Sequence, residues 1–82
     1  NVNKRYLTYM LIHTNDDKNH MLDIIQIVSM ANISVDSLNT ISRGEKSIYE
    51  LSCYVSSIDQ LNHLILNLSK NKYIEKVERA IR

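Results

Sequence analysis

The order of strand-like and helix-like segments is the feature that most limits what this chain can fold into. Residues 5–14 are rich in Tyr, Thr, Leu and Ile, which is typical of a strand. Over residues 20–31 apolar side chains recur at three- and four-residue spacing, which predicts an amphipathic helix. Two strands (33–42 and 47–55), a second helix and a last strand (74–81) complete the order strand, helix, strand, strand, helix, strand.

Local signals support these boundaries. Asn32 suits a left-handed cap after the first helix, and Gly44, the only glycine, suits a positive φ in the turn 43–46. Ser57 and Gln60 form a capping-box pattern at the start of the second helix. We expect the first helix to bury Met21, Ile24, Ile25, Val28 and Ala31, the third strand Tyr49, Leu51, Cys53 and Val55, and the second helix Leu61, Leu64, Ile65 and Leu68.

This order predicts an α+β fold, the ferredoxin-like βαββαβ sandwich. Right-handed crossovers then give a four-stranded antiparallel sheet in the order 4-1-3-2, with both helices on one face. Both sides of the first strand are largely apolar, so we expect it to be a central strand with each face covered at least in part. We assign Tyr6, Met10 and Ile12 to the face without helices.

Composition limits the function. Eighty-two residues make a single domain, residues 1–82, with 44% apolar and 23% charged residues. So small a core is marginal alone, and we expect a fragment of a larger protein that forms a homodimer or packs on the other domains of its chain. A net charge of +1 gives no strong field toward nucleic acid or membranes, and no apolar run is long enough to span a bilayer.

No catalytic constellation or phosphate-binding loop is present, so we expect no catalytic residue and no cofactor. His13, His20 and His63 lack the spacing of metal ligands, so no metal site is expected. Asp16 and Asp17 precede a helix, where capping explains them. The single Cys53 excludes an internal disulfide, agrees with a cytoplasmic location, and is expected to be a core thiol.

Residues 13–25 resemble the end of the first strand and the start of the first helix in ACT domains, the small ligand-sensing modules of many amino-acid metabolic enzymes. The family pattern Asp-Arg-x-Gly-Leu-Leu, followed three residues later by Ile, is matched by Asp17, Lys18, Asn19, His20, Met21, Leu22 and Ile25. Asn32, Ile33 and Ser34 resemble the family's entry into the second strand. His20 takes the place of the family glycine, where a side chain narrows the approach of a ligand to the backbone.

The C-terminal third is similar to the ACT domain that ends the RelA/SpoT enzymes, which make and hydrolyse (p)ppGpp. The residues that carry this similarity are Tyr54, Val55, Ile58, Asp59, Leu61, Leu64, Ile65, Leu68, Ile74, Val77 and Arg79. The resemblance covers about residues 6–82, and most of these positions are core positions.

The resemblance implies an amino-acid site between the segment after the first strand and the second strand of a partner subunit. Its candidate residues are Asn15, Asp17, Asn19, His20, Met21, Leu22, Asn32 and Ser34. Read without the family, His20 is a solvated residue of the first helical turn.

Lys4, Arg5, Arg79 and Arg82 are expected to meet at one corner of the sheet. The RelA/SpoT resemblance implies that such a corner contacts the phosphates of ribosome or tRNA, whereas the residues alone describe an ordinary solvated end.

We therefore expect the C-terminal regulatory domain of a RelA/SpoT-type (p)ppGpp synthetase/hydrolase (a GTP pyrophosphokinase), which relays ligand or ribosome/tRNA signals in the stringent response. Two alternatives stay open: an amino-acid-binding ACT domain of a biosynthetic enzyme, and an oligomerisation module without a ligand.

Overall fold

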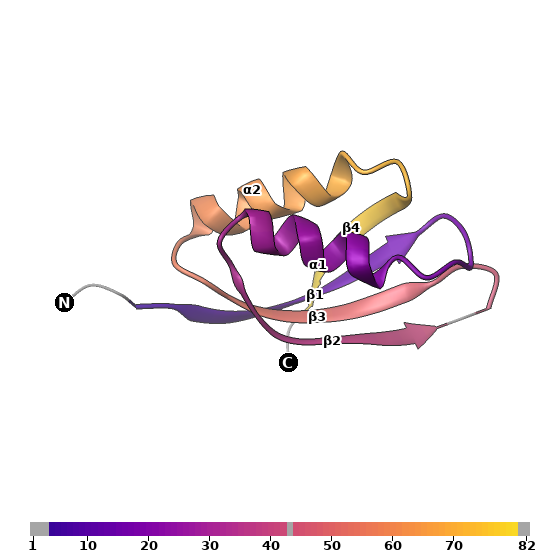
Figure 1. Cartoon of the computed structure of the whole chain (residues 1–82). Helices are drawn as coiled ribbons and strands as arrows, with labels where there is room; N and C mark the ends of the chain where they lie inside the picture. Colours follow the sequence, from indigo (N-terminus) through magenta and orange to yellow (C-terminus); the bar gives the residue numbers. More distant parts are fainter. Residues whose placement is uncertain (1–3, 43, 81–82) are drawn as a thin grey trace.

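The predicted order of elements is confirmed by the structure, a computed structural model that describes residues 4–42 and 44–80. The elements are β1 (Tyr6–Thr14), α1 (Met21–Met30), β2 (Ser34–Ser42), β3 (Ile48–Val55), α2 (Ile58–Ser69) and β4 (Ile74–Ala80). The strands form one antiparallel sheet in the order β2-β3-β1-β4, which is the predicted order read from the other edge. Both helices cover the same face of this sheet, as expected (Figure 1).

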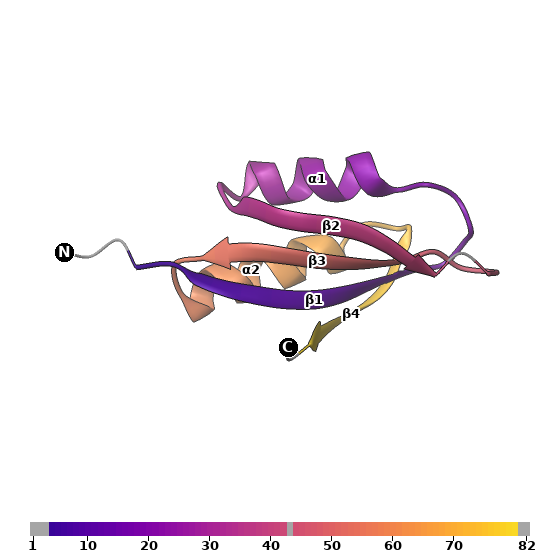
Figure 2. The same cartoon turned by 90° about the horizontal axis from the view of Figure 1, so that it is seen from below.

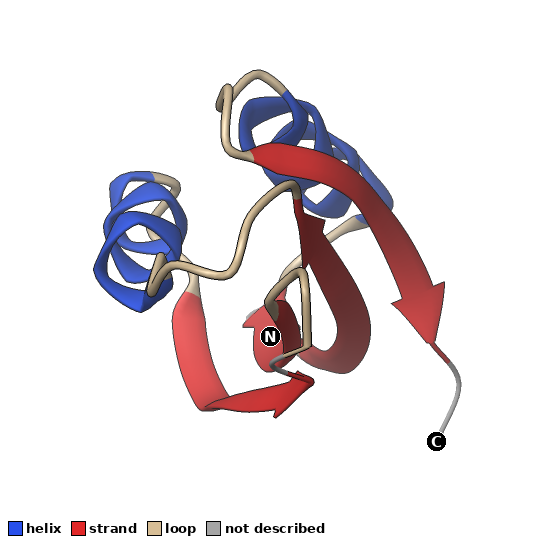
Figure 3. Cartoon of the chain, turned by 90° about the vertical axis from the view of Figure 1, so that its right-hand side faces the viewer, coloured by secondary structure: helices blue, strands red, loops and turns tan. Residues whose placement is uncertain are grey.

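The helices divide the covered face between them. α1 runs along the side of β2, and α2 lies over the side of β4 (Figures 2 and 3). Seen from below in Figure 2, the opposite face of the sheet carries no helix. The edges of the sheet are therefore β2 and β4, and β1 and β3 form its centre.

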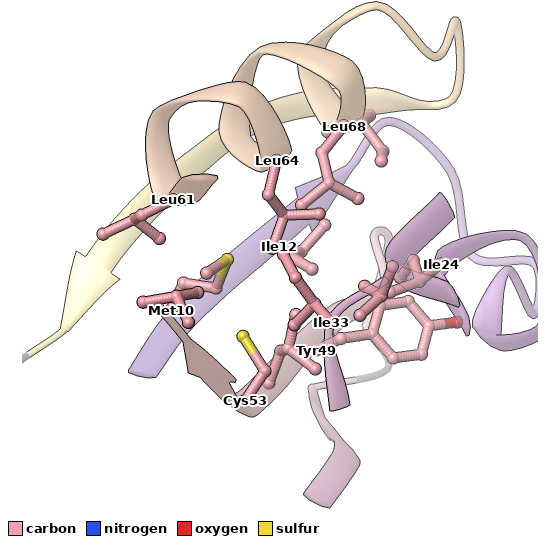
Figure 4. Close-up of a cluster of buried hydrophobic side chains, with 13 residues drawn as sticks. Met10, Ile12, Ile24, Ile33, Tyr49, Cys53, Leu61, Leu64 and Leu68 are labelled. Atoms are coloured by element: carbon pink, nitrogen blue, oxygen red, sulfur yellow. The ribbon is translucent and has the colours of Figure 1, made fainter. Parts of the chain in front are cut away.

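The core fills the space between the sheet and the two helices (Figure 4). Its buried apolar side chains are Met10, Ile12, Ile24, Val28, Ile33, Tyr49, Leu51, Cys53, Val55, Leu61, Leu64, Leu68 and Ile74. The predicted inward set of β3 and the predicted buried face of α2 are both confirmed, with Ile65 only partly buried.

The assignment of the two faces of β1 was wrong. Met10 and Ile12 are fully buried beneath the helices instead of facing away from them, and Tyr6, opposite Val55, also lies on the helix side, beside α2. The register explains this result, because Met10 lies opposite Leu51 and Ile12 lies opposite Tyr49. Residues directly opposite each other in a sheet share a face, so the inward set of β3 determines the inward set of β1.

Two smaller expectations also fail. In α1, Ile25 is 40% exposed, and Ile27 packs against the core in its place. Gly44 does not have a positive φ, whereas Asn32 has a φ of 59°, as its position after the C-terminus of α1 predicts.

Ser57 caps α2 as predicted and accepts a hydrogen bond from the backbone N–H of Gln60 (3.1 Å). Gln60 does not complete the reciprocal box, because its Oε1 accepts from the N–H of Ser56 instead (2.6 Å).

Within the described ranges, neither helix has the length and apolar character needed to cross a bilayer.

We expect Leu64→Ala to lower the free energy of unfolding by about 2–5 kcal/mol, because it empties a fully buried position. Leu66→Ala is the matched control, since Leu66 lies in the same helix but is 53% exposed. This control is expected to change stability by less than about 0.5 kcal/mol. Urea denaturation of both variants measures the difference, and equal losses would contradict the described packing of α2.

Candidate functional site

The segment between β1 and α1, residues 15–20, is tied to the start of β3 by several hydrogen bonds. The hydroxyl of Thr14 donates to the carbonyl oxygen of Ser47 (2.8 Å), and the N–H of Ser47 donates to the carbonyl oxygen of Asp16 (2.7 Å). The hydroxyl of Ser47 donates to the carbonyl oxygen of Lys18 (2.9 Å). These bonds hold the backbone of the segment in one conformation against the sheet.

Tyr49 supports this segment from below. Its side chain is 1% exposed, and its hydroxyl accepts a hydrogen bond from the backbone N–H of His20 (2.9 Å) and lies 3.4 Å from the carbonyl oxygen of Lys18. Sequence reasoning placed Tyr49 only in the core. A signal was nevertheless available, because a buried tyrosine hydroxyl usually finds a hydrogen-bond partner.

His20 is buried, so the reading of a solvated first-turn residue is wrong. Its Nε2 lies 2.7 Å from Oδ1 of Asp16, its Nδ1 lies 3.7 Å from a carboxylate oxygen of Asp23, and its ring stacks on Tyr73 at 4.6 Å. The hydrogen bond from His20, with a second one from the backbone N–H of Lys18, lowers the pKa of the Asp16 carboxyl. His20 thus packs inside its own segment and holds it to the loop before β4.

A hollow of about 230 Å³ lies between this segment, the end of β2 and the start of β3. Its lining residues are Asp17, Lys18, Asn19, Thr40, Ser47 and Tyr49. They offer a carboxylate, an ammonium group, an amide and hydroxyls, so the hollow can bind a small molecule that carries both charges and hydrogen-bonding groups. The structure therefore brings the predicted Asp17 and Asn19 together with Thr40, Ser47 and Tyr49, which sequence reasoning missed.

The other candidates of the segment have structural partners or are exposed. The amide nitrogen of Asn15 donates to the carbonyl oxygen of Lys72 (2.8 Å), and Oδ1 of Asn19 accepts from the N–H of Met21 (2.9 Å). Met21 packs partly against the core, whereas Leu22 is 80% exposed at the start of α1.

Asn32 and Ser34 lie at the other end of α1, so they are separated from the hollow of their own chain. The ten residues of α1 span about 15 Å. Both residues are exposed, and the hydroxyl of Ser34 accepts a hydrogen bond from Arg5 (3.3 Å). One copy of the chain therefore does not unite the two predicted halves of the site.

Of the four predicted basic residues, the structure places two, Arg5 and Arg79, by their contacts. Arg5 lies over the ring of Tyr54 and reaches Ser34 on the β2 side, whereas Arg79 lies on β4, opposite Met10. Lys4 is exposed, and Arg82 lies outside the described residues. Contact with RNA stays a prediction.

Two further side chains with reactive groups, Cys53 and His13, are buried or paired within the fold. Burial raises the pKa of the Cys53 thiol to about 11, which suits an inert core residue. His13 pairs with Glu78 (2.7 Å) on the open face of the sheet. Across residues 4–42 and 44–80, no group of three or more His, Cys, Asp or Glu side chains is arranged to hold a metal ion.

The element order, the single covered face and the hollow define a small βαββαβ domain. The sequence profile of the ACT domain matches residues 2–79, so the chain belongs to the ACT domain family. Comparison with curated proteins gave no match.

Solved structures share the fold. The crystal structure of the ACT domain from GTP pyrophosphokinase of Chlorobium tepidum is 23% identical with a TM-score of 0.78, over 94% of this chain and 100% of that one. Its solution structure has a TM-score of 0.79 at 19% identity, over 95% and 89% of the two chains. A homoserine dehydrogenase from Thiobacillus denitrificans is 20% identical with a TM-score of 0.74, over 94% of this chain and 17% of the enzyme.

We expect Tyr49→Phe to lower stability by about 1–3 kcal/mol, because the N–H of His20 loses its buried partner. Amide hydrogen exchange of His20 should also become faster. Tyr54→Phe is the matched control on the same strand, since Tyr54 is only partly buried and lies on the open face. If both variants are equally stable and exchange alike, Tyr49 does not anchor the segment.

The pKa of Asp16 lies below its ordinary value of 3.8, so the ionised carboxyl stabilises the folded chain above that pH. This stability is lost as the pH falls through the lowered pKa. Asp16→Asn is expected to destabilise the chain at neutral pH and to flatten the acid limb of its stability curve. The pKa of Glu78 is also lowered from its ordinary value of 4.5. Glu78 therefore causes a similar loss of stability at acid pH, and Asp16→Asn retains that loss.

The control is Asp17→Asn, because the side chain of Asp17 is exposed. Denaturation at several pH values measures both variants. An unchanged acid limb in Asp16→Asn would show that the pair with His20 does not stabilise the fold.

Proposed function

We propose that this chain is the C-terminal regulatory domain of a RelA/SpoT-type (p)ppGpp synthetase/hydrolase, and that it relays amino-acid or ribosome/tRNA signals to catalytic domains elsewhere in the protein. The cytoplasm is the proposed location. Membership of the ACT family carries the proposal, and the fold shared over the full length of the ACT domain from a GTP pyrophosphokinase supports it. In such a module a ligand shifts the parent enzyme between two states only by binding one of them more tightly.

We further propose that the domain works as a homodimer paired through β2. The two edges of the sheet differ in protection, because β4 carries Glu75, Lys76, Glu78 and Arg79, whereas β2 carries only Asp36. Charged side chains discourage pairing at an edge strand. Bulges interrupt the pairing of β2 with β3 near both ends of β2, and between them residues 37–40 keep a regular register.

An antiparallel pair of β2 strands would unite the two halves of the predicted site. The end of β2 lies beside the hollow of its own chain, where Thr40 is a lining residue. In such a pair, the start of β2 in one copy faces the end of β2 in the other. Residues 32–35 of the partner would therefore approach Asp17 and Lys18, and exposed apolar groups such as Leu22 and Val35 (80% and 39%) could be covered.

The hollow suits an α-amino acid. Asp17 can pair with the ammonium group of the ligand and Lys18 with its carboxylate, and the hydroxyls of Thr40 and Tyr49 lie nearby. The ring of His20 is held in place by Asp16 of its own segment and by Tyr73 of the loop before β4.

A second candidate is the amino-acid-binding ACT domain of a biosynthetic enzyme. The structural likeness to part of a homoserine dehydrogenase favours it. The encoded sequence beyond these 82 residues separates the two candidates: a (p)ppGpp synthetase domain supports the first, and a biosynthetic catalytic domain overturns it.

NMR titration of the ¹⁵N-labelled chain with a panel of amino acids tests the ligand. We expect saturable shifts in the amides of residues 15–22 and 32–35. Lys18→Met should weaken binding roughly tenfold, because it removes a charged hydrogen bond to the carboxylate. Lys70→Met, at the exposed end of α2, is the matched control. Silence across the panel would overturn the amino-acid proposal and would favour a domain that acts through protein or ribosome contacts.

A further inference from the structure

A second concave site lies at the other end of the molecule. It is a groove of about 300 Å³ between the start of β1, the end of β3 and the first turns of α2. We call it the distal groove. β1 begins at this groove and ends at the segment before α1, and its nine residues span about 30 Å. The distal groove is therefore separate from the hollow assigned above.

The walls of the distal groove are mainly apolar. Val55 and Leu61 line the groove and are almost fully buried (4% and 1% exposed). Tyr6 and Ile58 also line it and remain 56% and 60% exposed. Apolar side chains left open around a concave surface are typical of a binding site.

One positively charged side chain, that of Arg79, lines this apolar groove. Of the described residues that line the groove, Arg79 alone is charged. Its guanidinium group makes no ion pair or hydrogen bond with the described part of the chain. The other arginine whose side chain is described, Arg5, does have partners in Tyr54 and Ser34. Arg79 is thus available to an anion from outside.

We infer that the distal groove binds a small monocarboxylate with an apolar tail. The planar guanidinium of Arg79 matches a carboxylate in a bidentate hydrogen-bonded pair, and the tail would lie on Val55, Leu61 and Ile58. The groove, at about 300 Å³, has room for an apolar tail of several carbon atoms with a branch or a ring.

The same lining selects against an α-amino acid. No described residue of the groove carries a carboxylate, since Asp59 of the first turn of α2 is not among them. The ammonium group of an amino acid would lie close to the positive charge of Arg79 without an acidic partner, which is unfavourable. Isocaproate and leucine have the same carbon skeleton and differ only in this ammonium group. They are therefore a matched pair of ligands.

NMR titration of the chain with isocaproate, leucine and isohexanol tests the inference. We expect saturable shifts with isocaproate at residues 6–8, 55–61 and 79, and weaker binding of both other compounds, isohexanol because it lacks the carboxylate. Binding of leucine at residues 15–22 would concern the site under the proposed function and would leave the amides of the distal groove unshifted. The two proposals can therefore fail separately.

Arg79→Gln is expected to weaken isocaproate binding roughly tenfold or more, and Arg79→Lys to have an intermediate effect. Lys76→Gln is the control, because Lys76 is an exposed cation of the same strand that lies opposite His13 on the open face. A dispersed amide spectrum verifies that each variant is folded. The inference is overturned if isocaproate causes no saturable shift at the distal groove, if isohexanol or leucine binds there equally well, or if Arg79→Gln binds like the unaltered chain.

Discussion

The pairing of β1 with β3 is the contact on which the rest of the structure depends. It places Met10 opposite Leu51 and Ile12 opposite Tyr49, so that one face of both central strands becomes the floor of the core. The helices cover that face because β3 places its apolar residues there. A shift of one residue in this register would turn every one of these side chains to the opposite face. The same pairing carries Tyr49 beneath residue His20, so the packing of the core and the shape of the hollow have one origin.

The two ends of the central strands differ in chemistry. At the end of β1, polar groups are matched within the chain: backbone and side-chain hydrogen bonds fix residues 15–20, and His20 is enclosed by Asp16 and Tyr73. At the start of β1, the apolar distal groove is open and Arg79 has no partner among the described residues. An end with a fixed polar frame suits recognition of a charged polar ligand, whereas an open apolar end suits a ligand that brings its own negative charge.

Most of the fold could be predicted from sequence because its signals are local. Alternation in β3, the cap at Ser57 and the left-handed Asn32 each report on a few neighbouring residues, and all three predictions agree with the structure. The faces of β1 could not be assigned from β1 alone, because both are apolar and only its partner strand distinguishes them. The hollow was half predicted, since Thr40 of β2 and Ser47, just before β3, are distant in sequence from the segment 15–20. The burial of His20 depends on Tyr73, more than fifty positions away, and no local pattern reports such a contact.

The claim that joins fold to function is that two copies pair through β2 and share one site. The most direct test is an NMR experiment on a mixture of ¹⁵N-labelled and ¹³C-labelled chains, filtered for contacts between different molecules. The account predicts contacts across the β2 edge, with residues 37–40 of one copy near the same strand of the other, and slow exchange of the outward amides of β2. The account would be contradicted by a chain that is monomeric at the concentration of the NMR sample. It would also be contradicted by a dimer whose contacts run through β4, the helices or the open face.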